Sequence, residues 1–215
     1  MSPANRSFEI GVLAVVAIVL VVSLVDPLYP RLQLLQHVPT VAGFLLLGVA
    51  SWRRWVSRGA FVCCAVFLLL HIVGARWIYT LVPYDDWSRS LFGSCPADWF
   101  GWTRNHYDRG VHLAFGFLAI VPLLEFAVRR GRLTPGWALA FAIAAMNSTS
   151  AVYEIFEWVL TIVAHSEQAD AYNGQQGDAW DTQKDMALAA IGGLLAAPWA
   201  WIRTREIALG AASEG

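Results

Sequence analysis

Six stretches of apolar sequence, each near the length of a membrane-spanning helix, constrain the fold of this chain more than any other feature. They cover residues 8–25, 38–52, 59–81, 109–128, 136–164 and 184–202. A helix needs about 20 apolar residues to cross the hydrocarbon core of a bilayer, and backbone groups in lipid must find their hydrogen-bond partners within the protein. Because the stretches show no strict alternation, they indicate helices. The sequence therefore predicts an all-α integral membrane protein, a bundle of six transmembrane helices in a single domain over residues 1–215.

Composition supports the membrane and excludes some function classes. The chain is 57% hydrophobic and 14% charged, against about 25% charged residues in an ordinary soluble domain. A net charge of −1 provides no basic surface for nucleic acid. The three cysteines, two of them adjacent in an apolar stretch, do not make a disulfide framework. The first apolar stretch has no small-residue cleavage site after it, so we expect a retained helix and not a signal peptide.

The arginines predict how the helices are oriented. They cluster in 52–58, 129–132 and 203–205, and positive residues favour the cytoplasmic side of a membrane. Both termini are therefore predicted inside, and 26–37, 82–108 and 165–183 outside. The tryptophan-rich segment 83–104 is too polar to span, so we predict a loop between the third and fourth helices that lies as a lid at the outer interface.

Ionisable residues from four of the predicted helices reach the same outer depth. Asp108 and His112 are four residues apart, as are Asp181 and Asp185, while Glu154 and Glu157 are three apart, so each pair shares a helix face. Two glutamates one turn apart within a span repel each other unless a proton, a cation or a metal ion neutralises them. Carboxylates in this position are rare and usually functional. The pattern predicts a shared polar site on the periplasmic side.

Histidines mixed with carboxylates suit Zn²⁺, Mn²⁺ or Fe²⁺ better than Mg²⁺ or Ca²⁺, so we expect one of the former and no organic cofactor. The candidate metal ligands are His71, His106, Asp108, His112, Glu157 and Asp178. The candidate catalytic residues are Glu154, Asp181 and Asp185. The candidate substrate-binding residues are Arg76, Tyr107, Arg109, Trp180 and Lys184, in which the cations would hold a phosphate or another anionic group.

Several of these residues also have structural interpretations. Asp178 and Asp181 have the position of helix caps, Arg109 and Lys184 that of side chains reaching lipid headgroups, and His106 that of an exposed loop residue. Glu125 is expected to pair with Arg129 one turn later. His37 is expected at the interface. Gly192 and Gly193 are expected at a close helix contact.

Three segments resemble the signatures of a known family. They are NHYDRGVHLAFGF, YEIFEW and GQQGDAWDTQKDMALAAIGG, and they are similar to those of the bacterial YjdF-type inner-membrane proteins over roughly residues 65–195. The matching positions are His106, Tyr107, Asp108, Arg109, His112, Glu154, Glu157, Gly177, Asp178, Trp180, Asp181, Gln183, Lys184 and Asp185. The resemblance implies a multi-pass protein of the bacterial inner membrane and supplies no reaction.

Three function classes fit the sequence. The first is a metal-dependent enzyme that acts at the outer leaflet on a lipid or lipid-linked substrate, with phosphoester hydrolysis favoured and redox chemistry on an acyl chain as another reaction. The second is a secondary transporter or proton pathway, although the acids lie on one side and no repeat halves are visible. The third is a structural or assembly protein with an inert network of ion pairs. Membrane lipid is the expected partner, and the sequence leaves the oligomeric state open.

Overall fold

The described part of the chain forms six long helices and two short ones. The computed structural model describes residues 3–163 and 175–213, so most of the predicted outer segment 165–183 and residue 164 lie outside the described part. The helices are α1 (Pro3–Ser23), α2 (Pro30–Trp52), α3 (Arg58–Arg76), α4 (Tyr84–Phe92), α5 (Pro96–Phe100), α6 (Tyr107–Arg129), α7 (Pro135–Val163) and α9 (Asp181–Ser213). Six of them are long and apolar enough to cross a membrane, which confirms the predicted architecture.

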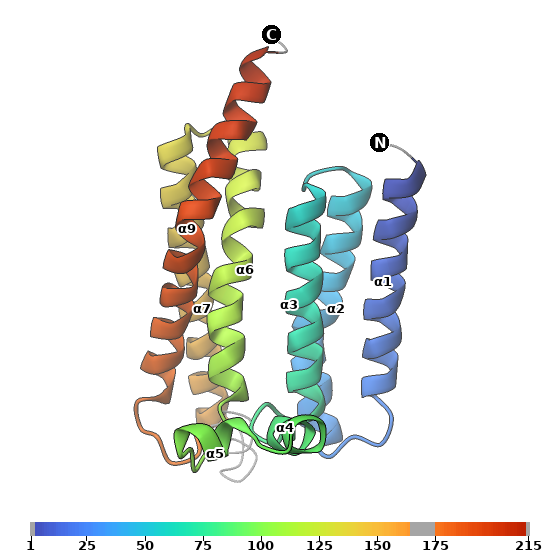
Figure 1. The fold of residues 1–215 in the computed structure, drawn as a ribbon, viewed down its shortest axis with the longest axis vertical. Coiled ribbons are helices and arrows are strands. Elements are labelled where there is room, and N and C mark those ends of the chain that lie inside the picture. The colour runs from blue at the N-terminus through green and yellow to red at the C-terminus, as the bar shows by residue number, and fades with distance from the viewer. Residues whose placement is uncertain (1–2, 164–174, 214–215) are drawn as a thin grey trace.

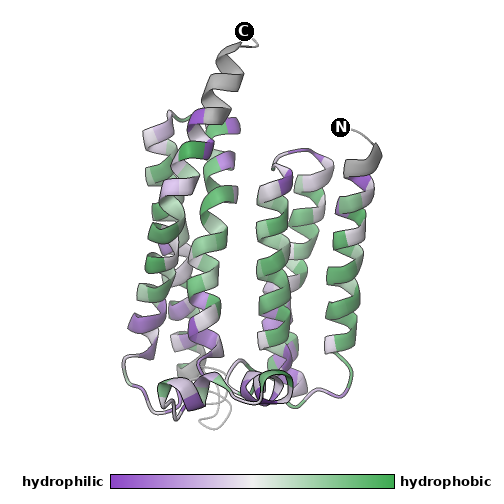
Figure 2. Cartoon of the chain, in the orientation of Figure 1, coloured by the Kyte–Doolittle hydropathy of each residue, from purple (hydrophilic) through white to green (hydrophobic). Residues whose placement is uncertain are grey.

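The long helices pack as two groups of three (Figure 1). Helices α1, α2 and α3 share one apolar core around Phe61 and Ile72, and α6, α7 and α9 share another around Ile120 and Met146. Contacts between α3 and α6 join the groups. Apolar residues occupy the middle of the helices, and polar residues are concentrated toward their ends (Figure 2), as expected for helices that span lipid.

The two ends of the bundle are formed by different segments of the chain. The chain termini and the α2–α3 and α6–α7 connections lie at one end, which we call the arginine end, and α4 and α5 lie at the other, which we call the polar end (Figure 1). The predicted lid segment is thus folded into two short helices, and its place at an outer interface stays a prediction. Four predicted boundaries differ by five residues or more. Helix α1 begins at Pro3 and α9 continues to Ser213, and α2 begins earlier, at Pro30, a favourable first helical residue. Helix α3 ends earlier, at Arg76, before Ile78 and Tyr79 adopt positive φ.

A glycine contact brings α6 and α9 together. A Cβ atom on Gly116 of α6 would collide with the backbone of Ala189, and one on Gly192 of α9 would collide with the backbone of Leu113. The two backbones therefore touch, which confirms the predicted close contact at Gly192 and brings the first turns of α6 and α9 side by side at the polar end.

At the arginine end a buried carboxylate joins the two groups of helices. Glu125 of α6 accepts hydrogen bonds from the backbone N–H of Ser57 (2.7 Å) and from its hydroxyl (2.6 Å), while Ser57 caps the start of α3. The predicted partner Arg129 lies farther away, with its Nε 3.8 Å from the carboxylate. Glu125 therefore serves mainly as a link between α3 and α6.

Candidate functional site

Three helices deliver buried ionisable side chains to the polar end. Asp108 and His112 lie on the first two turns of α6, Glu154 and Glu157 on α7, and Asp181 and Asp185 on the first turns of α9. All six are buried, none with more than 8% of its surface exposed. The i, i+4 and i, i+3 spacings place both members of each pair on the same helix face, and the contact between α6 and α9 brings two of those faces together.

The innermost part of the site is a group of three potential ligands. One ligand atom from each of Asp108, His112 and Asp185 lies within 4.8 Å of the other two. His112 Nε2 is 3.6 Å from Asp108 Oδ1 and 3.3 Å from Glu154 Oε1. An imidazole nitrogen thus faces three carboxylates from three helices.

Two buried carboxylate oxygens, one in this group and one next to it, have no hydrogen-bond partner among the described residues. They are Glu154 Oε1 and Asp185 Oδ1; the former is near His112 Nε2, but the contact lacks the geometry of a hydrogen bond. Thr182 hydrogen-bonds to the Glu154 side chain, and Tyr153 to that of Glu157. A buried carboxylate oxygen without a partner is costly unless a proton, a cation or a metal ion satisfies it. The site is therefore incomplete in its own polar contacts.

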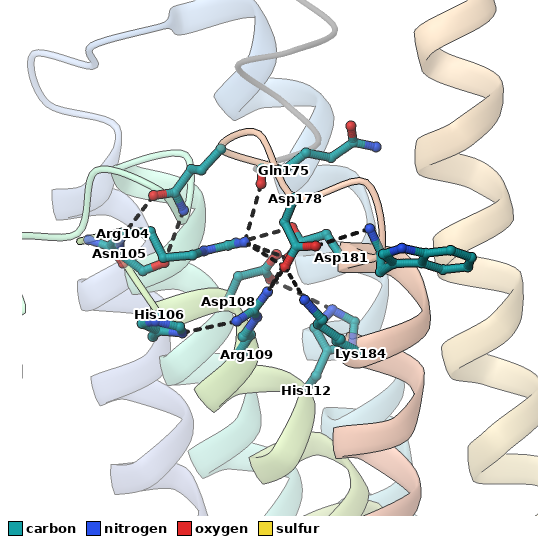
Figure 3. A network of polar contacts seen from close by, with 12 residues as sticks. Arg104, Asn105, His106, Asp108, Arg109, His112, Gln175, Asp178, Asp181 and Lys184 are labelled. Atoms are coloured by element: carbon teal, nitrogen blue, oxygen red, sulfur yellow. Dashed lines mark hydrogen bonds and ion pairs between the residues drawn. The ribbon is translucent and has the colours of Figure 1, made fainter. Parts of the chain in front are cut away.

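Ion pairs cover this group on the side of the polar end (Figure 3). Asp181 Oδ1 lies 2.9 Å from Arg104 Nη1 and 2.8 Å from Arg109 Nη2. Asp178 Oδ2 lies 2.5 Å from both Arg109 Nη2 and Lys184 Nζ. The hydrogen bond from Lys184, together with one from the Trp180 backbone, holds the pKa of Asp178 well below its usual range. Asp178 therefore stays ionised. We call these ion pairs, which cover the buried acids, the ion-pair layer.

Hydrogen bonds beside the ion-pair layer join the loop before α6 to the segment before α9. The Asn105 backbone N–H donates to Gln176 Oε1, and Gln176 Nε2 donates back to the Asn105 carbonyl, both at 2.9 Å. Asn105 also donates to the carbonyl of Val82 (2.8 Å), and the His106 N–H donates to Tyr84 Oη (2.9 Å). These bonds fasten the connection between α3 and α6 over the buried acids.

Formal charge in the whole site is unbalanced. It contains six carboxylates, from Asp108, Glu154, Glu157, Asp178, Asp181 and Asp185, and three cations, from Arg104, Arg109 and Lys184. With histidine neutral, six negative charges and three positive charges give a net charge of −3. The three cations all bind Asp178 or Asp181. The excess negative charge therefore belongs to Asp108, Glu154, Glu157 and Asp185, which together with His112 we call the inner group.

The structure brings together only part of the residue set that the sequence suggested. Asp185, predicted as a base, lies with Asp108 and His112 as a potential ligand, while Glu157, predicted as a ligand, is buried outside that group of three. His106 packs against Trp102 and lies 3.4 Å from Arg109; burial, with the nearby arginines, lowers its pKa. His106 and the ion-paired Asp178 lie outside the group of potential ligands.

Four further predicted site residues point elsewhere. Arg76 donates to the carbonyl of Asp26 (2.7 Å), and the Tyr107 hydroxyl donates to that of Leu70 (2.9 Å). Trp180 is 66% exposed. Both ring nitrogens of His71 are engaged, because Nε2 donates to the Gln36 carbonyl (2.9 Å) and Nδ1 accepts from the Tyr79 hydroxyl. His71 therefore has no nitrogen left for a metal.

Sequence reasoning missed two features. Arg104 stands in the site where Arg76 was expected; its position three residues before the first turn of α6 was the available signal. His37, expected at the interface, is buried between the Ser23 hydroxyl (3.1 Å) and the Thr40 hydroxyl (3.3 Å). Glutamines one turn apart, Gln33 and Gln36, accompany it in the interior, a pattern that could have indicated a buried polar face on α2.

A cavity of about 510 Å³ adjoins the inner group. It lies between α2 and α3 on one side and α6 and α7 on the other. Asp108, His112, His71 and Tyr79 line it toward the polar end, and Val56 and Leu123 line it toward the arginine end. Most of its other lining residues are apolar. The potential ligands Asp108 and His112 thus lie at the polar end of an apolar cavity between the helices, which is open on one side.

The sequence matches a known protein family over most of its length. The model of a family described as predicted membrane protein (DUF2238) matches residues 8–206. The chain belongs to this family. It is also 29% identical to the inner membrane protein YjdF of Escherichia coli (strain K12) over 168 residues, which are 77% of this chain and 76% of that one. No solved structure matches it. The expected family is confirmed, and membership makes the chain a multi-pass membrane protein.

Proposed function

We propose that this protein is a metal-dependent membrane hydrolase whose metal ion is bound by Asp108, His112 and Asp185. The observation that carries the proposal is the convergence of these three buried side chains within 4.8 Å, with two carboxylate oxygens, of Asp185 and Glu154, that lack partners in the part of the chain that the structure describes. A divalent cation would satisfy the Asp185 oxygen and offset most of the formal charge of −3.

The donor set favours Zn²⁺, Mn²⁺ or Fe²⁺. One imidazole nitrogen and two carboxylates are a mixed set that these ions accept, whereas Mg²⁺ and Ca²⁺ favour oxygen alone. Three protein ligands also leave a coordination position open, as in catalytic zinc sites. A water molecule in that position would be activated by the metal.

Glu154 would act as the general base. Its Oε1 lies 3.3 Å from His112 Nε2 and has no hydrogen-bond partner among residues 3–163 and 175–213, so it could accept a proton beside the metal. In phosphoester hydrolysis the water oxygen would bond to phosphorus, one water proton would pass to Glu154, and the ester P–O bond would break. The leaving oxygen would then take up a proton. Arg109 and Lys184, which already bind Asp178, would share their charge with the substrate phosphate.

The substrate is proposed to be a membrane lipid or lipid-linked molecule at the outer leaflet of the inner membrane. The arginine pattern predicts the polar end on the periplasmic side, and the E. coli relative is named as an inner membrane protein. The chamber beside Asp108 and His112 is apolar and lies among the spanning helices, which suits a substrate with a hydrocarbon part.

The transporter alternative receives less support from the same cavity. A pathway for ions or protons needs polar groups along its length, but the walls beyond His112 toward the arginine end are formed by residues such as Phe115, Leu118 and Leu123. The acids are concentrated at one end of this chamber.

Elemental analysis of the purified protein tests the proposal. We expect about one equivalent of Zn, Mn or Fe, and loss of most of it in Asp185→Asn and His112→Ala. His106→Gln is the matched control, because it removes a neighbouring histidine outside the group and should keep the metal. Metal-free wild-type protein after supply of all three ions, or metal retained in both ligand variants, would contradict the proposal.

A further inference from the structure

The walls of the cavity beside the inner group change from polar to apolar along its length. Toward the polar end its walls carry Asp108, His112 and Tyr79, and toward the arginine end they carry Cys63, Pro122 and Leu123. A ligand that fills it must therefore be polar at one end and apolar along the rest, which is the chemistry of a lipid.

The length and the volume of the cavity indicate how many hydrocarbon chains it can hold. The lining residues of α6 run from Asp108 to Leu123, which at 1.5 Å per residue is a length of about 22 Å. The cavity volume of about 510 Å³ equals roughly 17 groups of the size of a water molecule, which is about one long hydrocarbon chain.

The depth to which the cavity extends along α6 indicates where the head group and the chain of a lipid would lie. It extends past the middle of the α6 span, since Tyr107–Arg129 is 23 residues long and the lining reaches Leu123. One leaflet of hydrocarbon is only about 15 Å deep. A single chain in the cavity would therefore reach beyond the midplane, with its head group held at the buried acids.

We propose that this cavity binds a lipid with a single hydrocarbon chain, with the head group at Asp108 and His112 and the chain end near Cys63 and Leu123. The inference rests on the proposed function in that it names the substrate class of the same site. Occupation of the cavity by the chain does not require the metal, so the two proposals are separable by experiment.

Photo-crosslinking tests it with hexadecyl phosphate that carries a diazirine near the chain end. The full-length protein is placed in nanodiscs of phosphatidylcholine, irradiated, and the adducts are mapped by mass spectrometry. We expect adducts on the stretches around Cys63 and Leu123, reduced about fivefold by unlabelled hexadecyl phosphate at four times its Kd and unaffected by two-chain phosphatidic acid. Adducts confined to exposed side chains such as Leu45, or equal competition by the two-chain lipid, would overturn the proposal.

Two matched variants make the result specific. Ala50 lines the cavity toward the arginine end, and Ala42 of the same helix is exposed and outside it. Ala50→Phe should shorten the cavity, so that dodecyl phosphate competes better than hexadecyl phosphate, whereas Ala42→Phe should keep the wild-type order. An unchanged order in a folded Ala50→Phe protein would contradict the assignment of the chain to this cavity.

The Asp185→Asn variant separates the inference from the proposed function. It should lose metal and still crosslink near Cys63 and Leu123 when the probe is hexadecanol with the same diazirine, which carries no charge to be repelled by the acids. Metal loss with retained crosslinking supports both proposals. Crosslinking near Cys63 and Leu123 in a wild-type protein that never binds metal supports the lipid site alone, and metal binding without these adducts supports the enzyme and overturns the single-chain site.

Discussion

His112 Nε2 of α6 lies 3.3 Å from Glu154 Oε1 of α7, in a buried pocket that both side chains share with Asp108 and Asp185. The imidazole is thus within reach of carboxylates from three helices. Such a group can bind a metal ion only after it releases protons, and this requirement leads to a test that does not depend on knowing the substrate.

Metal affinity should rise with pH. Each proton displaced from the ligands by the ion contributes about a tenfold gain in affinity per pH unit over the range in which that proton is bound. Titration of the metal-free protein with Zn²⁺ at several pH values, with a competing chelator, measures the slope. A flat profile would show that the ion does not compete with protons at Asp108, His112 and Asp185.

Glu154→Gln should separate metal binding from catalysis. The amide has nearly the same shape as the carboxyl group but cannot accept the proton of water, so the loss of general-base catalysis should lower kcat by about 10²- to 10⁴-fold. Metal content should stay within a few-fold of wild type. The measurement is elemental analysis beside turnover of a single-chain lipid phosphate, and loss of the ion in this variant would instead make Glu154 a ligand.

Asp178 should stabilise the fold in a pH-dependent way. Because the hydrogen bond from Lys184 lowers its pKa in the folded protein, its contribution is fully present above the ordinary carboxyl pKa and is lost as the pH falls through the lowered one. Asp178→Asn should therefore lower the Tm in detergent at neutral pH and lower it less in acid. Asp86→Asn, an exposed residue of α4, is the control and should leave the Tm profile unchanged.

The six helices were predictable because each must be apolar over most of its length, a property that any window of the sequence reveals. The depth of the site was predictable for the same reason, since the polar residues interrupt those windows near one end. Boundaries were less accurate where a polar turn such as Gln33–Gln36 belongs to the buried face of α2, because a hydropathy window treats buried polar residues as exposed ones.

The rotation of each helix about its axis was not predictable from one sequence. Arg76 and Arg104 both stand near the polar end, yet Arg76 contacts Asp26 and Arg104 contacts Asp181. His71 and His112 similarly share a depth, while only His112 faces the acids. Depth follows from hydropathy, but partner choice follows from packing, and here the α6–α9 contact decides which residues meet.

The α6–α9 contact should depend on Gly116. A Cβ atom there would meet the backbone of Ala189, which cannot move aside as a flexible side chain can. Gly116→Ala should destabilise the protein by about 2 kcal/mol, within the usual range for overpacking. Gly110→Ala is the matched control on the same helix, where nothing lies within 4 Å, and it should stabilise the helix by up to about 1 kcal/mol. Unfolding in a denaturing detergent measures both.

The link between α3 and α6 should depend on Glu125 and Ser57 together. Ser57→Ala removes a helix cap, at a cost of about 1 kcal/mol. Glu125→Ala leaves the Ser57 N–H without its acceptor, at a cost of about 2 kcal/mol. In a double-mutant cycle the two effects should be non-additive by at least about 0.5 kcal/mol. Arg129→Ala, which removes a half-exposed partner at 3.8 Å, should cost no more than about 0.5 kcal/mol.

The orientation of the protein in the membrane determines which leaflet supplies the substrate. The arginine clusters predict the arginine end in the cytoplasm, so a cysteine at Ser90 of α4 should react with a membrane-impermeant maleimide in intact cells. A cysteine at Arg132, in the α6–α7 connection, should react only after lysis. Both positions are exposed, and the native Cys63, Cys64 and Cys95 are replaced by alanine in this background. The reverse labelling pattern would place the buried acids at the cytoplasmic leaflet, and the lipid head group would then have to enter from that side.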